Sequence, residues 1–338
     1  MAAINNLRGM LLEEALLYLL RKSGYTTIDN AGTDPTLVNG RSGLEVKGRG
    51  EKHQIDAIAD YKASPPFCNP QRLLVEGKMY DSNYPVGLPV IRNAVGVLKD
   101  INEFFYSSDI ENEPSKNRYH YTYGIFSASG YRTSAVRYAY AHDIYLIPVA
   151  QSHFFRPVVN TIRSINADDL RNSGLKIQTL RNIVRENFRS DIETSISISE
   201  AELNYKLNEY IKECKKIGFA FIAIAGNSFP ILLIPSPNFN LSELYSIDFY
   251  RIRYDQNGWY LEDGEERRLF SFDLPAELFK LFANEGVLTQ QAALDLKESR
   301  LADFRIIVEQ DNELKSIKMN LDREWIQTIR DLMNNSER

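Results

Sequence analysis

The hydrophobic positions near the start of the chain recur at the spacing of an amphipathic helix. Between Leu7 and Lys22 apolar side chains return every three or four residues, and Gly24 supplies a stop signal at the C-terminal end. Glu14 falls inside this apolar stripe. An acid at such a position is rare unless it is paired, so Glu14 is a candidate functional side chain, with an ion pair to Arg21 as the structural alternative.

Runs with a period of two predict β-strands after this helix. A loop-like stretch rich in Asn, Asp, Gly and Pro comes first, at residues 29–43. Two strands on either side of residues 48–50 then indicate a β-hairpin, and alternation in a third strand places Glu76 and Lys78 on one face. These strands are expected at residues 44–47, 54–61 and 73–80.

Two further helices and two further strands complete the first part of the chain. They are expected at residues 91–105, 119–126, 134–141 and 144–149. The resulting order α-β-β-β-α-β-α-β indicates an α/β fold in which helices flank a mixed sheet.

The pattern changes after residue 150, where a polar segment with many arginines precedes another helix and then several short strands. Helices are also expected near residues 275–298. Because 338 residues exceed the usual size of a single core, we expect more than one domain. The expected parts are an α/β domain at 1–155, a helical connecting segment at 156–200 and a second, α+β domain at 201–338.

The composition is that of a globular protein, with 43% hydrophobic and 25% charged residues. No segment approaches the roughly 18 apolar residues of a membrane helix. Glu13 and Glu14 interrupt the leucine-rich start, which argues against a signal peptide, so we expect a cytoplasmic location without membrane association. Cys68 and Cys214 are far apart in the sequence and are expected to be ordinary buried thiols.

The net charge is -5, although the first 150 residues contain equal numbers of acidic and basic side chains. This balance argues against a protein coated in phosphate-binding surface. It is compatible with a nuclease whose basic groups are concentrated in one cleft.

Asp56 and the segment Glu76-Gly77-Lys78 carry residue types that suit phosphodiester hydrolysis. A hydrated Mg²⁺ held by two or three carboxylates can orient a water, polarise the phosphate and stabilise the leaving oxygen. Asp56 and Glu76 would hold the metal, and Glu14 would reach in from the first helix as a further ligand or base. Lys78 would position or deprotonate the attacking water and neutralise charge; as a base it would need a depressed pKa.

Asp56 followed by Glu76-x-Lys78, a helix and a strand resembles the PD-(D/E)xK nuclease superfamily, and within it the Mrr-type restriction endonucleases. The opening helix with Gly9-x4-Glu14, and the later strand and turn from Gly124 to Gly130, are also similar to that group. Two features depart from its pattern: no proline precedes Asp56, and the Gln or Glu of the Mrr-type third motif is matched here by Glu76.

The resemblance covers about residues 7–149 and implies a restriction-endonuclease-like fold. It implies a Mg²⁺-dependent DNA endonuclease, with Mn²⁺ as a substitute, acting in restriction or phage defence. Cutting both strands is easiest with two sites related by a twofold axis, so a homodimer is expected. The region after residue 200 would select DNA, dimerise the protein or bind a regulatory protein partner.

Several other side chains are candidates for contact with DNA. Arg49 lies between two glycines, and His53 and Gln54 precede Asp56. Structural alternatives are a plain hairpin turn for Arg49 and an ordinary strand histidine for His53. Arg132 and Arg137, near and within a predicted helix, could contact the DNA backbone. A helical stripe could track phosphates or be a solvated face; it consists of Arg181, Arg185 and Arg189.

A second set in the same region also satisfies the pattern of an acid, a gap and Glu-x-Lys. It consists of Asp34 and the segment Glu45-Val46-Lys47. The downstream set is preferred because Asp34 lies in a loop-like stretch, whereas Asp56 and Glu76 have apolar, strand-like flanks.

Two alternative functions remain open from the sequence. A nuclease acting on RNA or single-stranded DNA would be favoured by a narrow groove and by stacking aromatic side chains beside the site. A noncatalytic nucleic-acid-binding or effector subunit would be favoured by an Asp56 carboxylate that points away from Glu76 and Lys78.

Overall fold

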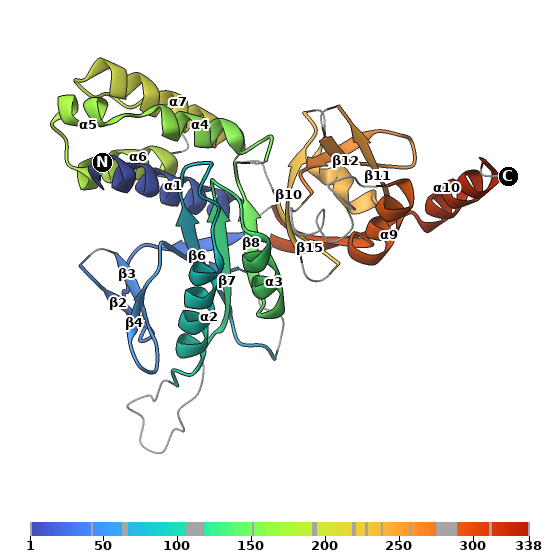
Figure 1. Cartoon of the computed structure of the whole chain (residues 1–338), viewed down its shortest axis with the longest axis horizontal. Helices are drawn as coiled ribbons and strands as arrows, with labels where there is room; N and C mark the ends of the chain where they lie inside the picture. Colours follow the sequence, from blue (N-terminus) through green and yellow to red (C-terminus); the bar gives the residue numbers. More distant parts are fainter. Residues whose placement is uncertain are drawn as a thin grey trace. The chain divides into compact units, whose positions relative to one another are not determined.

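The chain folds into two compact units, Met1–Gly218 and Phe219–Arg338. The computed structural model in Figure 1 describes residues 2–41, 43–62, 67–105, 118–150, 152–190, 195–217, 221–226, 229–237, 239–256, 258–274, 289–310 and 313–336. Helices and β-sheets occur in both units, so the mixed character expected from the sequence is confirmed.

The first unit is built on a five-stranded mixed sheet with the strand order β1-β5-β6-β7-β8. β1, β5 and β6 pair in antiparallel fashion, whereas β6, β7 and β8 run parallel to one another. The strands are β1 (Tyr25–Ile28), β5 (Ala57–Tyr61), β6 (Gln71–Lys78), β7 (His120–Ser127) and β8 (Ile144–Pro148). Parallel neighbours need crossover connections, which the helices between them supply.

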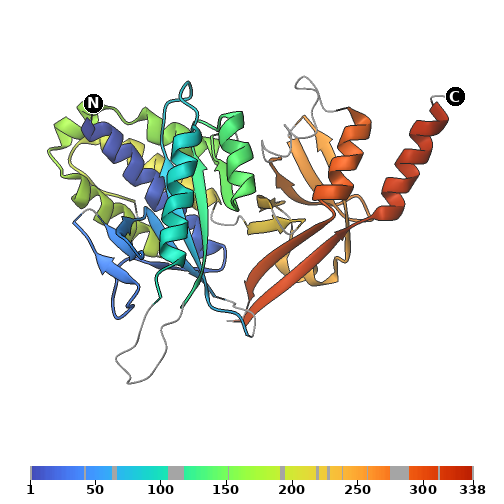
Figure 2. The same cartoon turned by 60° about the horizontal axis from the view of Figure 1, so that its bottom comes forward.

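Helices cover both faces of this sheet. On β6, a side chain at Gly77 would point at Leu12 and Leu16 of α1 (Ala2–Lys22), whereas Leu74 belongs to the core that contains Ile91 of α2 (Leu88–Asn102). Positions three apart on a strand face opposite ways, so α1 and α2 lie on opposite faces. Figure 2 shows α2 beside α3 (Thr133–Ala141) along the sheet.

The elements around this sheet follow the expected order α-β-β-β-α-β-α-β, but the first strand of that series is β1, which the sequence analysis missed. β1 has four residues, none of them fully buried. A short edge strand without clear alternation gives little periodic signal.

A separate three-stranded sheet lies in the sequence between β1 and β5. It contains β2 (Leu37–Asn39), β3 (Leu44–Lys47) and β4 (Lys52–Gln54). The predicted hairpin is confirmed, because β3 pairs with β4 in antiparallel register. The strand predicted at 54–61 is wrong as a single element: it breaks at Ile55 and Asp56, where the chain passes from one sheet to the other.

The residues expected to connect two domains form helices that belong to the first unit. They are α4 (Arg156–Ser164), α5 (Ala167–Ser173) and α6 (Ile177–Arg189), followed by α7 (Ala201–Ile217). These helices pack on α1 and on one another, and the Tyr210 hydroxyl of α7 donates to the Leu11 carbonyl of α1 at 2.7 Å. The division between compact units falls at 218/219, whereas the first domain was expected to end at 155 and the second to begin at 201. Amphipathic patterns do not reveal which partner a helix covers.

The second unit contains a closed barrel of seven strands in the order β10-β13-β12-β11-β15-β14-β9, a closure that was not predicted. An apolar cluster that includes Tyr250, Phe270 and Phe304 fills its core. The predicted helix near 275–298 is described only as α9, since residues 275–288 lie outside the described residues. The elements are β9 (Phe221–Ala225), β10 (Phe229–Pro235), η1 (Leu241–Ser246), β11 (Phe249–Asp255), β12 (Gly258–Glu262), β13 (Arg268–Phe272), α9 (Gln290–Arg300), β14 (Asp303–Gln310), β15 (Glu313–Leu321) and α10 (Arg323–Ser336).

Two simpler expectations can also be compared with the structure. Within the described part of the chain, none of the helices combines the length and apolar character needed to cross a membrane. Cys214 is buried as expected, whereas Cys68 is exposed.

Candidate active site

Asp56 lies against the strand that carries Glu76 and Lys78. Ala57, the first residue of β5, is paired with Val75 of β6 in an antiparallel register, so Asp56 stands beside Glu76. Its carboxylate Oδ2 accepts a hydrogen bond from the Gly77 backbone N–H at 2.8 Å. A bend at the start of β5 thus brings the first acid of the motif to the end of β6.

Glu76 and Lys78 face the same side of β6, as their spacing predicts. The Lys78 ammonium forms an ion pair with Glu76 Oε1. The Tyr123 hydroxyl, from the neighbouring strand β7, donates to Glu76 Oε2 at 3.0 Å. Both charged side chains are largely buried, with 21% of Lys78 and 16% of Glu76 exposed. Glu76 is therefore held from two sides while it remains open to solvent at its edge.

The pKa values of Asp56 and Lys78 reflect burial and the negative charge of Glu76. Burial raises the pKa of Asp56, and the Glu76 charge adds to this rise, against the lowering effect of the Gly77 N–H. Burial alone would lower the pKa of Lys78, but the negative charge and hydrogen bond of Glu76 outweigh it and the pKa is raised. Lys78 as a general base needed a depressed pKa. The pKa of Lys78 is raised instead, which favours its charged ammonium form over a neutral base.

Glu13 lies within the electrostatic reach of Asp56. Burial, followed by the negative charge of Asp56, raises the pKa of Glu13 to about 7. Glu14 is fully buried, and its carboxylate accepts a hydrogen bond from Arg185 Nε at 3.0 Å. Glu14 is thus an ion-pair partner instead of the expected metal ligand or base, and Arg21 donates to Thr27 at 3.4 Å instead of pairing with it.

Glu13 was not among the site residues predicted from the sequence, because Glu14 is the acid at the centre of the apolar stripe of α1. The centre of the stripe is where a side chain is most deeply covered, and a charge there needs a fixed partner. The neighbouring position lies at the edge of the stripe, where a side chain can be partly buried and still reach a cleft. Glu13 has 21% of its side chain exposed, against 0% for Glu14.

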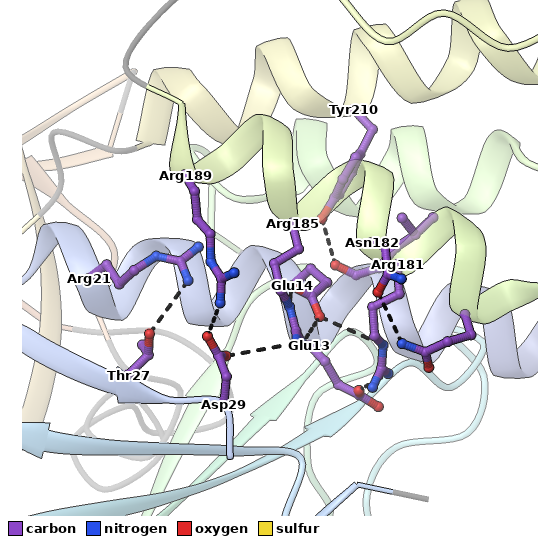
Figure 3. Close-up of polar contacts among 12 residues, drawn as sticks. Glu13, Glu14, Arg21, Thr27, Asp29, Arg181, Asn182, Arg185, Arg189 and Tyr210 are labelled. Carbon is purple, nitrogen blue, oxygen red and sulfur yellow. Dashed lines mark hydrogen bonds and ion pairs between the residues drawn. The ribbon is translucent and has the colours of Figure 1, made fainter. Parts of the chain in front are cut away.

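The arginine stripe of α6 supplies the partners of these acids (Figure 3). It is neither a solvated face nor a row free to track phosphates, because each arginine is paired within the first unit. In order along α6, the pairs are Arg181 with Glu13, Arg185 with Glu14 and Arg189 with Asp29.

The hairpin candidates for DNA contact are engaged by α2. Arg49 Nη1 pairs with Glu103 Oε2 at 3.1 Å, and His53 Nε2 lies 2.7 Å from Asp100 Oδ2. The structure therefore brings Arg49 and His53 to the C-terminal end of α2 and not to Asp56. Gln54, Arg132 and Arg137 are exposed.

In the competing set, Asp34 with Glu45-Val46-Lys47, the first acid and the lysine make structural contacts. Asp34 accepts hydrogen bonds from Arg72 at 2.8 Å and from the Tyr119 hydroxyl at 2.9 Å. Arg72, with 1% of its side chain exposed, also pairs with Asp60. Lys47 Nζ donates to the Pro35 carbonyl at 2.7 Å. These contacts join the three-stranded sheet to the five-stranded sheet.

The donor set at Asp56 suits a hydrated divalent cation better than a complete protein cage. Over the residues that the structure describes, no group of three or more His, Cys, Asp or Glu side chains is arranged to enclose a metal. However, Asp56 is partly buried and lies within the electrostatic reach of both Glu76 and Glu13. A Mg²⁺ ion is commonly held by one or two carboxylates and several waters, and it would relieve this repulsion.

Comparisons with known proteins leave the class of the protein open. No family model matches the chain, and no curated protein matches it. A solved structure described as a protein of unknown function, AF1548, matches with a TM-score of 0.31 and 18% identity, over 62% of this chain and 97% of that one. A TM-score this low does not establish a shared fold.

Proposed function

We propose that the first unit is a metal-dependent DNA endonuclease of the PD-(D/E)xK class, which hydrolyses phosphodiester bonds in restriction or phage defence. The observation that carries the proposal is the hydrogen bond from Gly77 to Asp56, at 2.8 Å, which joins the first acid to the Glu76-x-Lys78 strand. The mixed sheet and the element order around it are compatible with a restriction-endonuclease-like fold.

In this proposal Asp56 and Glu76 hold Mg²⁺ or Mn²⁺. When bound, the ion supplies a polarised phosphate and a water of lowered pKa. Lys78, in its ammonium form, would neutralise charge on the phosphate oxygens, and its ion pair with Glu76 keeps it beside a proposed metal ligand. Tyr123 fixes the second oxygen of Glu76. Glu13, whose pKa the charge of Asp56 helps to raise, is a further acid of the site in place of Glu14.

The orientation of Asp56 disfavours the noncatalytic alternative. A subunit that had lost chemistry would have no need to hold a buried acid against a second acid. The carboxylate of Asp56 points to the Glu76 segment, and burial together with the Glu76 charge raises its pKa. Maintaining such a group costs stability, which function explains and folding does not.

A nuclease for RNA or single-stranded DNA remains the second candidate, on account of two tyrosines that follow Lys78. Tyr80 and Tyr84 have 41% and 68% of their surface exposed. Exposed aromatic rings next to a phosphate-binding site can stack on unpaired bases. For cleavage of duplex DNA, we also propose that the protein is a homodimer. The second unit would select DNA or bind a regulatory partner.

The test is cleavage of supercoiled plasmid by the purified protein with Mg²⁺, Mn²⁺ or EDTA, beside Asp56→Asn and Lys78→Ala. Asp168→Asn is the matched control, since Asp168 is exposed on α5 and pairs only locally with Arg171. Metal-dependent cutting that both site variants lose and the control keeps is the expected result. Cutting that survives in both site variants would refute the assignment. Cutting of single-stranded oligonucleotides alone would select the second candidate.

A further inference from the structure

Arg181 connects α6 to the acids of the candidate site. Its Nη2 forms an ion pair with Glu13, and its Nε lies 3.7 Å from Glu14 Oε1. The positive charge of Arg181 also lowers the pKa of Asp56. Arg181 thus pairs with Glu13 and Glu14 (Figure 3). Asp56 lies close by, because Gly77, which donates to it, packs against Leu12, the neighbour of Glu13 in α1.

We propose that Arg181 is the resident counterion of the candidate metal site and competes with the divalent cation for Glu13 and Asp56. The inference rests on the proposed function. It extends the site beyond the segment that resembles known nucleases, because α6 lies at residues 177–189. Through this residue, α6 would set the metal concentration at which the site fills.

The contrast between Arg181 and Arg185 supports a competing role. Arg185 donates from both Nε and Nη2 to the fully buried Glu14, in a two-pronged contact that fixes both partners. The Nε of Arg181 is buried without a hydrogen-bond partner. Its hydrogen bond to Glu13 comes from Nη2. Arg185 is fixed on one acid, whereas Arg181 is shared between Glu13 and Glu14.

Electrostatics gives the direction of the effect. Two like charges repel whether or not they touch, so a guanidinium within several ångströms of a divalent cation weakens its binding. Replacing Arg181 by a neutral side chain should therefore tighten metal binding. A merely structural arginine would do the opposite, since its loss would loosen the carboxylates and weaken binding.

The experiment measures Mn²⁺ binding to the full chain by titration calorimetry, without nucleic acid. We expect Arg181→Gln to bind Mn²⁺ about tenfold more tightly than the natural protein, the order of effect that one repelling charge several ångströms from a dication has in a water-like dielectric. Arg181→Lys keeps the charge and should stay within about twofold. Arg189→Gln is the matched control, because Arg189 pairs with Asp29 at the far end of α6.

Asp56→Asn separates failure of this inference from failure of the proposed function. If the natural protein binds no Mn²⁺, or binds it unchanged in Asp56→Asn, the metal site and the inference are both refuted. If binding depends on Asp56 but Arg181→Gln binds Mn²⁺ equally or more weakly, the inference alone is refuted. An equal gain in Arg189→Gln would also refute it, because the effect would then be one of net charge.

Discussion

Two stretches of the first unit carry the same motif in opposite electrostatic surroundings. The upstream set, Asp34 with Glu45-Val46-Lys47, and the downstream set, Asp56 with Glu76-Gly77-Lys78, both satisfy the pattern of an acid, a gap and Glu-x-Lys. Asp34 is surrounded by donors that neutralise it, whereas Asp56 is placed beside other acids. The motif alone does not distinguish the two sets; the partners of the first acid do.

The pKa of the first acid records this difference. For both acids burial is the largest influence and raises the pKa. At Asp34, hydrogen bonds from Thr36 and Arg72 outweigh burial and the net pKa is lowered. At Asp56, the Gly77 N–H and the positive charges of Lys78 and Arg181 do not outweigh burial and the charge of Glu76, and the net pKa is raised. A fully satisfied carboxylate stabilises the fold, while an unsatisfied one is available to a ligand.

Neutralising each of the two acids in turn should give the largest difference between the two sets. Asp56→Asn should reduce metal-dependent plasmid cleavage by roughly 10³-fold, because it removes a charge from the proposed metal position. Its free energy of unfolding should be unchanged or higher at neutral pH. Asp34→Asn should cleave at the natural rate per folded molecule but lose about 1 to 3 kcal/mol of stability, since hydrogen bonds to a charged group are weakened.

Cleavage rates and urea unfolding of the same two preparations check this pair of expectations. An Asp34→Asn protein that is stable but inactive would assign the chemistry to the upstream set. In that case the preference for the downstream set would be wrong.

The next effect concerns the arginine that satisfies the upstream acid. Arg72→Met should cost roughly 3 to 5 kcal/mol of stability, because it leaves Asp34 and Asp60 without the buried guanidinium that pairs with both. Arg171→Met, at a pair whose arginine is 75% exposed, is the control and should change stability by less than about 1 kcal/mol. Thermal or urea unfolding measures both. Equal effects would contradict a structural role for the Arg72 cluster.

Sequence periodicity predicted the elements that bear the site, and it predicted the face shared by Glu76 and Lys78. The alternation of β6 and the apolar stripe of α1 depend on local spacing, which the chain displays directly. The break before β5 was not predictable in the same way. Residues 54–61 read as one apolar strand, and only the presence of two different sheets makes the chain bend at Asp56.

The partners of the charged residues could not be read from the sequence, because they come from distant segments. Glu14 and Arg185 are separated by 171 residues, and nothing local connects them. The same holds for Glu13 and Arg181, which are 168 residues apart. An acid in an apolar stripe signals that a partner exists. Whether that partner is a metal or an arginine depends on how α6 packs on α1.

A smaller effect is the dependence of stability on pH. Burial and the Asp56 charge raise the pKa of Glu13 from 4.5 to about 7. An acid whose pKa is raised by folding contributes stability that is fully present below its unfolded-state pKa. This contribution is lost as the pH rises through the folded-state pKa. Relative to Glu13→Gln, the natural protein should therefore lose stability between pH 4.5 and about 7, measured in EDTA.

Asp34 should change the pH dependence of stability in the opposite direction. Its lowered pKa contributes stability that is present above the unfolded value and is lost as pH falls through the folded one. The difference between the natural protein and Asp34→Asn should shrink only in acid. A Glu13→Gln difference that is flat from pH 4.5 to 7 would remove Glu13 from the cluster of mutually repelling acids.

The smallest expected effect separates the two lysines of the paired motifs. Lys47 Nζ donates to the Pro35 carbonyl at 2.7 Å, so Lys47→Ala should cost about 1 kcal/mol of stability, the usual worth of one such hydrogen bond. Cleavage should be unaffected, in contrast to Lys78→Ala, whose ammonium is proposed to meet the phosphate. Parallel plasmid assays and unfolding curves of the two variants provide the measurement. If Lys47→Ala lost cleavage while its stability fell by only this amount, the upstream lysine would have a chemical role and the contrast between the two sets would fail at its weakest point.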